Sequence, residues 1–211
     1  MSKKGRKIGL MGGTFDPVHH GHMVLAEQVR TRFGLDEIIF IPSGIAPHKS
    51  LEKVTDKQLR YEMTLLATTN NPYFTVSDIE ISRDEISYTI NTIQRIKEQF
   101  GSEDEFYFIT GADAIMELHL WHDFENLIGM CNFIAATRPG IDEEELKSKI
   151  DRMVKDYRAN IFVTEVPALS ISSTDIRRRV KYDLSIKYLL PEIVESYILK
   201  KKLYVNENKV L

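Results

Sequence analysis

Residues 12–22 read GGTFDPVHHGH and come directly after the short apolar run KIGLM at residues 7–11. An apolar run of this length predicts a buried strand, and the connection from a first strand to a helix is a favoured phosphate site in α/β proteins. Gly12 and Gly13 have no Cβ, so we expect the main chain to bend there and to approach a ligand closely. The three histidines that follow leave three interpretations open, namely a surface turn, a metal site and a phosphate-binding loop.

The rest of the chain alternates short apolar runs with longer amphipathic segments. The runs predict strands at residues 7–11, 37–41, 74–81, 105–110, 132–136 and 160–164. The amphipathic segments predict helices at residues 23–33, 55–70, 88–100, 143–157, 174–182 and 192–200. Strands that are apolar throughout and alternate with helices are typical of a parallel sheet covered on both faces. We therefore expect an α/β fold with a single Rossmann-like domain, its core at residues 7–169, and a small helical C-terminal extension at residues 170–211.

The composition restricts the function classes. The chain has 211 residues and a formal net charge of −3, so it lacks the basic excess of general nucleic-acid or membrane-surface binders. It has no apolar stretch long enough to span a membrane, and we expect a cytoplasmic protein. The single cysteine, Cys131, excludes an intrachain disulfide, and we expect it to be buried in a strand.

His19 and His22 are three residues apart, which places both rings on one side of a helix if the first turn includes them. The main-chain N–H groups at a helix start attract anions, and imidazole N–H groups there can donate to phosphate oxygens. We expect Gly21, between the two histidines, to leave room for a nucleotide against the helix start. These features favour the phosphate interpretation.

Two common nucleotide motifs are absent, because the glycines do not fit GxGxxG and the chain contains no GxxxxGK[ST]. The histidines also lack the cysteine or HExxH partners that would strengthen a metal site. We therefore assign no residue to a metal.

A second block, ISSTDIR at residues 171–177, combines hydroxyl side chains with an arginine. Ser172, Ser173 or Thr174 would cap a helix, and Arg177 would follow about one turn later. Together they would form a second anion site. From these residues alone, a capped surface helix with solvated arginines is an equally good interpretation.

Together the two blocks carry a family resemblance. GGTFDPVHHGH contains the [HT]xGH-type motif of the nucleotidyltransferase superfamily related to class I aminoacyl-tRNA synthetases. Its fuller form resembles the GGTFDPVHxGH motif of bacterial nicotinate mononucleotide adenylyltransferases, and ISSTDIR resembles their SSTxIR motif. The resemblance extends over roughly residues 7–200. It implies an enzyme of NAD biosynthesis that transfers the adenylyl group of ATP to nicotinate mononucleotide, with Mg²⁺ carried by the phosphates.

The resemblance also implies site residues. His19, His22 and Arg177 would be catalytic, by holding and neutralising the triphosphate. The expected ATP-binding residues are Gly12, Gly13, Thr14, Phe15, His19, His22, Gly111, Asp113, Ser172, Ser173 and Arg177. Those expected for nicotinate mononucleotide are Lys49, Thr89 and Trp121.

Some of these positions have ordinary structural interpretations. Asp113 follows a predicted strand and would either accept from ribose hydroxyls or cap a helix. Trp121 would either stack on the pyridine ring or pack in the core. His122 replaces a tyrosine that is often found beside that tryptophan in the family, and Lys49 would also fit a plain charged loop.

Other functions and assemblies stay open. Phosphopantetheine adenylyltransferases and cytidylyltransferases share the fold, and a nucleotide-sensing module could keep the phosphate site without turnover. A homo-oligomer is a further alternative, since Tyr188, Leu189, Leu190 and Tyr197 would suit either an interface or the core. We expect them in the core.

Overall fold

The computed structural model describes residues 5–45, 54–101, 103–137, 140–167 and 169–206. Within these ranges six parallel strands form one sheet. The strands are β1 (Lys7–Gly13), β2 (Glu37–Pro42), β3 (Phe74–Val76), β4 (Glu105–Gly111), β5 (Asn132–Thr137) and β6 (Ile161–Glu165). The expected parallel α/β sheet is confirmed.

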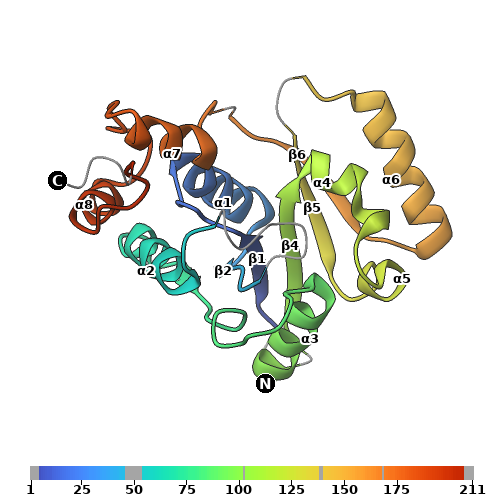
Figure 1. The fold of residues 1–211 in the computed structure, drawn as a ribbon. Coiled ribbons are helices and arrows are strands. Elements are labelled where there is room, and N and C mark those ends of the chain that lie inside the picture. The colour runs from blue at the N-terminus through green and yellow to red at the C-terminus, as the bar shows by residue number, and fades with distance from the viewer. Residues whose placement is uncertain (1–4, 46–53, 102, 138–139, 168, 207–211) are drawn as a thin grey trace.

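The strand order is β3-β2-β1-β4-β5-β6, so the chain builds outward from β1 in both directions. Between β1 and β4 the direction of winding reverses (Figure 1). In open parallel sheets, ligands bind beyond the carboxyl ends of the strands at this reversal. The GGTFDPVHHGH stretch and Gly111 occupy those two strand ends.

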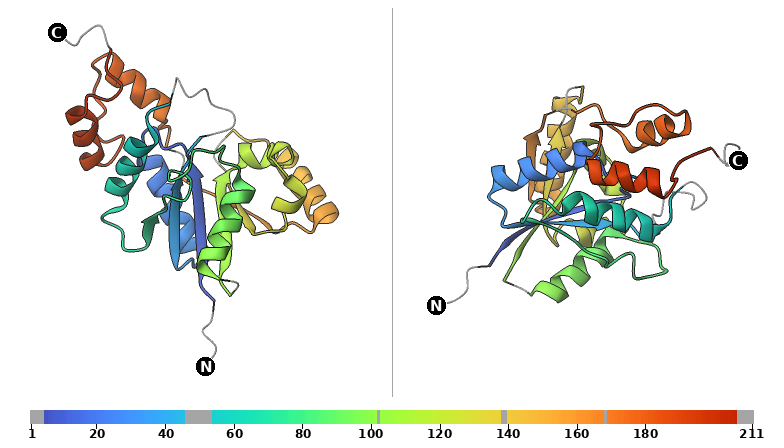
Figure 2. Two further views of the ribbon diagram at one scale, coloured as in Figure 1. Left: turned by 60° about the horizontal axis from the view of Figure 1, so that its bottom comes forward. Right: turned by 90° about the vertical axis from the view of Figure 1, so that its left-hand side faces the viewer.

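Helices cover both faces of the sheet. The longer helices are α1 (His20–Phe33), α2 (Lys57–Thr68), α3 (Thr89–Phe100), α6 (Glu143–Tyr157), α7 (Ser173–Lys181) and α8 (Glu192–Lys200). Short helical pieces follow β4, namely α4 (Ala112–Met116), the 3-10 turn η2 (Leu118–Leu120) and α5 (Phe124–Leu127). Figure 2 shows α7 and α8 beside α1 and α2, on the face opposite α3.

Two apolar clusters hold these layers together. Ile8 and Leu10 of β1 belong to the cluster under α3 and α6, whereas Met11 belongs to the cluster under α1 and α2. This division follows from the alternation of side chains along a strand. Ile176 and Ile198 from the C-terminal helices are fully buried in the second cluster. The C-terminal segment therefore completes the core on that face.

The structure corrects several expectations. The strand expected at residues 74–81 ends at Val76, because a turn begins at Ser77, whose hydroxyl accepts from the N–H of Ile79. Cys131 is only partly exposed, but it precedes β5 instead of lying within it. Tyr188 is not a core residue, since it lies in a turn with a positive φ of 65° and is 82% exposed. Leu189, Leu190 and Tyr197 do pack against the second cluster, as expected.

None of the helices in the described ranges combines the length and the apolar composition that crossing a bilayer requires.

Candidate functional site

The site begins at the end of β1 with the two glycines. Gly12 and Gly13 are the last residues of the strand and do not form a bend. A Cβ on Gly12 would lie 3.3 Å from the Phe108 ring, and one on Gly13 would lie 2.9 Å from the Phe15 ring. The glycines thus make room for aromatic rings at the switch point.

The chain turns over Phe15, which has a positive φ of 48° and is buried. It then enters α1, with His19 as the N-cap residue and His22 in the first turn. The two imidazole rings stack with their centroids 3.8 Å apart, and the edge of the Phe15 ring approaches His22 at 5.0 Å. The expectation that both rings lie on one side of the helix start is confirmed.

Burial keeps these imidazoles neutral at physiological pH. It lowers the pKa of His19 to about 4 and that of His22 to about 3, with smaller contributions from the neighbouring histidines. The main-chain N–H of His19 donates to Nδ1 of His22 at 3.2 Å, so the proton of neutral His22 resides on Nε2. His19 Nδ1 is buried and has no hydrogen-bond partner among the described residues. The pair therefore retains unused hydrogen-bonding capacity.

Gly21 lies directly against the His19 ring. A Cβ at Gly21 would lie 3.0 Å from both Cε1 and Nδ1 of His19, closer than ordinary van der Waals contact. Without a Cβ, Gly21 therefore leaves room for the His19 ring at the helix start.

The second block folds as predicted and meets the first. Ser172 caps α7 by accepting from the N–H of Asp175 at 3.1 Å. The Ser173 hydroxyl donates to the carbonyl of Pro17 at 2.9 Å, and Arg177 Nη1 donates to the carbonyl of Asp16 at 2.6 Å. The two predicted anion sites are thus joined side by side.

A cavity of about 360 Å³ opens where the blocks meet. Its lining includes His19, Gly21, His22, Gly111, Ser172 and Ser173. These residues come from the carboxyl end of β4 and from the N-termini of α1 and α7. Imidazole, hydroxyl and main-chain N–H donors at two helix starts suit an anionic ligand.

Arg177 lies beside this cavity and is not part of its lining. Its guanidinium is turned toward Asp16, 4.0 Å from the carboxylate, and its side chain is 32% exposed. The next two arginines are engaged elsewhere, since Arg178 and Arg179 both pair with the Asp175 carboxylate at 2.6 Å. Arg177 is therefore the arginine of this run that faces the GGTFDPVHHGH stretch.

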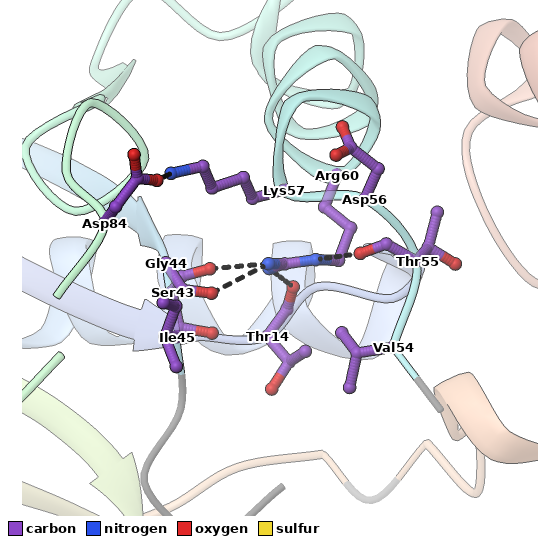
Figure 3. Close-up of a pocket in the computed structure, with 10 residues that line it drawn as sticks. All are labelled: Thr14, Ser43, Gly44, Ile45, Val54, Thr55, Asp56, Lys57, Arg60 and Asp84. Atoms are coloured by element: carbon purple, nitrogen blue, oxygen red, sulfur yellow. Dashed lines mark hydrogen bonds and ion pairs between the residues drawn. The ribbon is translucent and has the colours of Figure 1, made fainter. Parts of the chain in front are cut away.

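A second cavity, of about 270 Å³, has Thr14, Ser43 and Gly44 in its lining (Figure 3). It contains Arg60, a buried cation that is only 2% exposed. Its guanidinium donates to the carbonyls of Thr14 and Ser43, both at 2.7 Å, and its Nε donates to that of Thr55 at 2.8 Å. Burial lowers the pKa of Arg60, while nearby carboxylates, first Asp16, raise it. Because Arg60 is engaged with carbonyls, it ties the ends of β1 and β2 to the start of α2.

Asp16 is the buried anion of the same region. The residue is only 4% exposed. Its carboxylate accepts from the Tyr204 hydroxyl at 2.7 Å and from the main-chain N–H of Thr55 at 3.2 Å. Asp16 thus contacts the segment just before α2, the C-terminal segment and Arg177.

The residues expected at the second substrate lie around α3 and the pieces after β4. Thr89 is the first residue of α3, and no described side chain caps that helix. Trp121 is partly buried and packs edge-on against Phe108, with ring centroids 5.9 Å apart. His122 stacks on Tyr88 at 4.1 Å, which brings the tryptophan segment next to the start of α3.

Asp113 and Lys49 are the two remaining positions of the expected site. Asp113 is not the helix cap, because Gly111 occupies the N-cap position of α4 and Asp113 lies exposed in its first turn. Lys49 lies outside the described residues.

Arg60 and Tyr204 were not among the expected site residues. Arg60 had a recognisable signal, since it lies three residues before Met63 on the inward face of α2. Tyr204 gave none, because it follows the last helix and belongs to no predicted helix or strand. The described residues also contain no group of three His, Cys, Asp or Glu side chains placed to hold a metal ion.

Comparison with known proteins places this geometry in context. A cytidylyltransferase-like family matches residues 10–179. A probable nicotinate-nucleotide adenylyltransferase of Thermoanaerobacter sp. (strain X514) is 51% identical over 203 residues, covering 96% of each chain. One of the same name from Moorella thermoacetica is 52% identical over 204 residues, covering 97% of this chain and 94% of the relative.

Among solved structures, the Plasmodium falciparum nicotinic acid mononucleotide adenylyltransferase complexed with NaAD shares the fold. The TM-score is 0.78 at 24% identity, and the match covers 94% of this chain and 97% of that chain.

Proposed function

Because the chain belongs to the nicotinate-nucleotide adenylyltransferase family, within the cytidylyltransferase-like group, we propose that it transfers the adenylyl group of ATP to nicotinate mononucleotide. The products are nicotinate adenine dinucleotide and pyrophosphate, and the reaction is a late step of NAD biosynthesis.

The chemistry requires no nucleophile from the protein. A 5′-phosphate oxygen of nicotinate mononucleotide attacks the α-phosphorus of ATP, and the bond from that phosphorus to the oxygen bridging to the β-phosphate breaks. The substrate phosphate is already ionised at neutral pH, so no strong general base is needed. Catalysis then depends on in-line alignment and on neutralising charge on the leaving pyrophosphate.

The observation that carries this proposal is the junction of the two blocks around one cavity. His19, His22 and Ser172 line it, and each offers a donor to a phosphate oxygen. The stacked imidazoles are desolvated, so their interaction with developing charge is less weakened by water. Arg177, beside the cavity, would exchange the carbonyl of Asp16 for the β- and γ-phosphates.

The other residues proposed to contact ATP lie at the ends of β1 and β4. Gly12, Gly13, Thr14 and Phe15 bring the main chain to the end of β1, and Gly111 is open to a ligand, since nothing lies within 4 Å of where its Cβ would be. Asp113, exposed in the first turn of α4, is placed to accept from ribose hydroxyls.

For the second substrate, the uncapped start of α3 supports a carboxylate site. The first N–H groups of a helix lack partners within the helix and favour an anion. Thr89 at this start would therefore receive the nicotinate carboxylate in preference to an uncharged amide, and Trp121 would contact the pyridine ring. Lys49 is proposed as a further contact on the resemblance alone.

ATP would enter as its Mg²⁺ complex. The donors around the cavity suit phosphate oxygens, and Mg²⁺ prefers oxygen ligands and retains several waters, so the phosphates would carry it. When bound, the ion shares in neutralising the phosphates. A cytoplasmic location stays a prediction.

Pyrophosphate release tests the proposal. The protein is mixed with ATP, Mg²⁺ and either nicotinate mononucleotide or nicotinamide mononucleotide, and we expect release that is faster with the nicotinate substrate. Tight ATP binding without release from either mixture would instead support a nucleotide-sensing module. Faster release with the nicotinamide substrate would contradict the carboxylate site at α3.

A further inference from the structure

Tyr204 connects the C-terminal segment to the phosphate site through one hydrogen bond. Its hydroxyl donates to Oδ1 of Asp16 at 2.7 Å, although the two residues are 188 positions apart. Tyr204 is partly buried against the second apolar cluster. Burial, and then the Asp16 carboxylate, raise the pKa of the phenol, so it remains a donor at physiological pH.

The backbone indicates that this contact is held in place. Tyr204 has a positive φ of 64°, which is unfavourable for a bulky residue and persists only where the surroundings require it. The segment after α8 is fixed by the N–H of Leu203, which donates to the carbonyl of Ile198 at 3.0 Å. The phenol is thus presented to Asp16 from an ordered turn.

Asp16 depends on this donor because its carboxylate is buried, and a buried carboxylate needs hydrogen-bond partners. Its two oxygens accept from Tyr204 and from the N–H of Thr55. Arg177 Nη1 lies 4.0 Å from Oδ2, close enough to become a tighter partner if the phenol were removed.

We propose that Tyr204 is a positioning residue for the polyphosphate site, acting through Asp16 on Arg177. By satisfying the Asp16 carboxylate, Tyr204 leaves the Arg177 guanidinium held by neutral acceptors, the Asp16 carbonyl at 2.6 Å and the Thr174 hydroxyl at 3.4 Å, from which a phosphate can take it. Without the phenol hydroxyl, Asp16 competes with the phosphates for Arg177. The inference rests on the proposed phosphate role of Arg177.

The chain provides a matched control. Tyr197 also donates its hydroxyl to a carboxylate, that of Glu62 on α2, and it also joins the C-terminal segment to that helix. Among the described residues, the Tyr197 side chain forms no hydrogen bond or ring contact with the GGTFDPVHHGH stretch, so Tyr197→Phe removes a similar hydrogen bond at a distance from Arg177. A comparison of Tyr204→Phe with Tyr197→Phe therefore distinguishes an effect on stability from an effect on the position of Arg177.

The experiment measures the dissociation constant of Mg²⁺–ATP by calorimetry, without the second substrate, and the thermal unfolding of each variant. We expect Tyr204→Phe to raise the dissociation constant roughly 10-fold, the range for a hydrogen bond to a charged group. Tyr197→Phe should leave it within about twofold of the wild-type value while lowering thermal stability by a similar amount. An unchanged constant in Tyr204→Phe overturns the proposal.

The route through Arg177 is tested by a double-mutant cycle. In an Arg177→Ala background, Tyr204→Phe should raise the dissociation constant of Mg²⁺–ATP by less than about a further twofold. A further increase of roughly 10-fold would show that Tyr204 acts by another route. If Arg177→Ala itself binds Mg²⁺–ATP as the wild type does, the proposed phosphate site fails and this inference fails with it. If only Tyr204→Phe is without effect, the proposed function stands and this inference alone is wrong.

A rescue covers the case in which Tyr204→Phe is poorly folded. Asp16→Asn removes the charge that would attract Arg177, so the double variant Asp16→Asn/Tyr204→Phe should bind Mg²⁺–ATP more tightly than Tyr204→Phe alone. A purely structural role for Tyr204 predicts no such recovery, and its absence counts against the proposal.

Discussion

Arg177 donates to the main-chain carbonyl of Asp16 at 2.6 Å, across 161 positions of sequence. This contact, together with that between Ser173 and Pro17, brings the start of α7 against the loop after β1. Helix α7 is therefore part of the candidate site as well as part of the core, and substitutions at its start should affect activity directly.

Arg177→Ala should lower kcat/KM for ATP by about 10²–10³-fold with little change in stability, since its donor would be lost where charge develops on the leaving group. Arg177→Lys should recover only part of the activity, because an ammonium cannot donate in a bidentate manner. Arg178→Ala is the control, as that side chain is exposed and pairs with Asp175, and it should retain nearly normal activity. Steady-state kinetics of pyrophosphate release would decide, and equal losses in the Arg177 and Arg178 variants would refute the assignment.

His22→Ala should reduce turnover by about 10²–10³-fold while the protein stays folded, as expected for removal of one preorganised donor. His20→Ala is the matched control, because His20 does not line the cavity and its N–H donates from the main chain to Leu189. Circular dichroism would verify folding, and kcat would be compared among the three proteins. Near-normal turnover in His22→Ala would remove this residue from the mechanism.

The histidine pair should also make the fold sensitive to acid. The folded-state pKa values of about 4 and about 3 lie below the ordinary value of 6.5, so between about pH 6.5 and pH 3 the unfolded chain binds more protons. The stabilising contribution is therefore complete above pH 6.5 and is lost as the pH falls through this window. His22→Asn keeps an acceptor for the His19 N–H but cannot titrate.

From pH 7 to pH 5, the wild type should lose about 2 kcal/mol more free energy of unfolding than His22→Asn, by linkage for one such group. Urea denaturation at the two pH values measures the difference. Parallel losses in the two proteins would mean that His22 is protonated as easily in the folded state as in the unfolded chain.

Arg60→Met should be strongly destabilising, by about 3–5 kcal/mol, because it leaves carbonyls of Thr14, Ser43 and Thr55 without their donor. Lys57→Met on the same helix breaks an ion pair with the exposed Asp84 and should change stability by less than about 1 kcal/mol. Urea denaturation of both variants provides the comparison. Similar stabilities would show that Arg60 is not the tie between β1, β2 and α2.

The sequence predicted the sheet well because apolar runs such as KIGLM encode burial locally. The signals for helix ends are also local, as at Ser172, whose hydroxyl caps α7. The pieces after β4 were missed, since α4 and α5 have only five and four residues, too short for a helical period to emerge.

The site was predicted less completely, because its contacts are between distant segments. The proximity of His19 and His22 follows from their spacing, but the Gly21 contact with the His19 ring depends on side-chain packing. The links of Asp16 to Tyr204 and Arg177 exist only in the folded chain.

The most direct test is a crystal structure with Mg²⁺ and a non-hydrolysable ATP analogue. The account predicts phosphate oxygens within about 2.7–3.2 Å of an imidazole nitrogen of His19 or His22 and of the Arg177 guanidinium, in the cavity lined by Ser172 and Ser173. A triphosphate bound instead beside Arg60, or Arg177 still directed at Asp16 with no phosphate near it, would contradict the account.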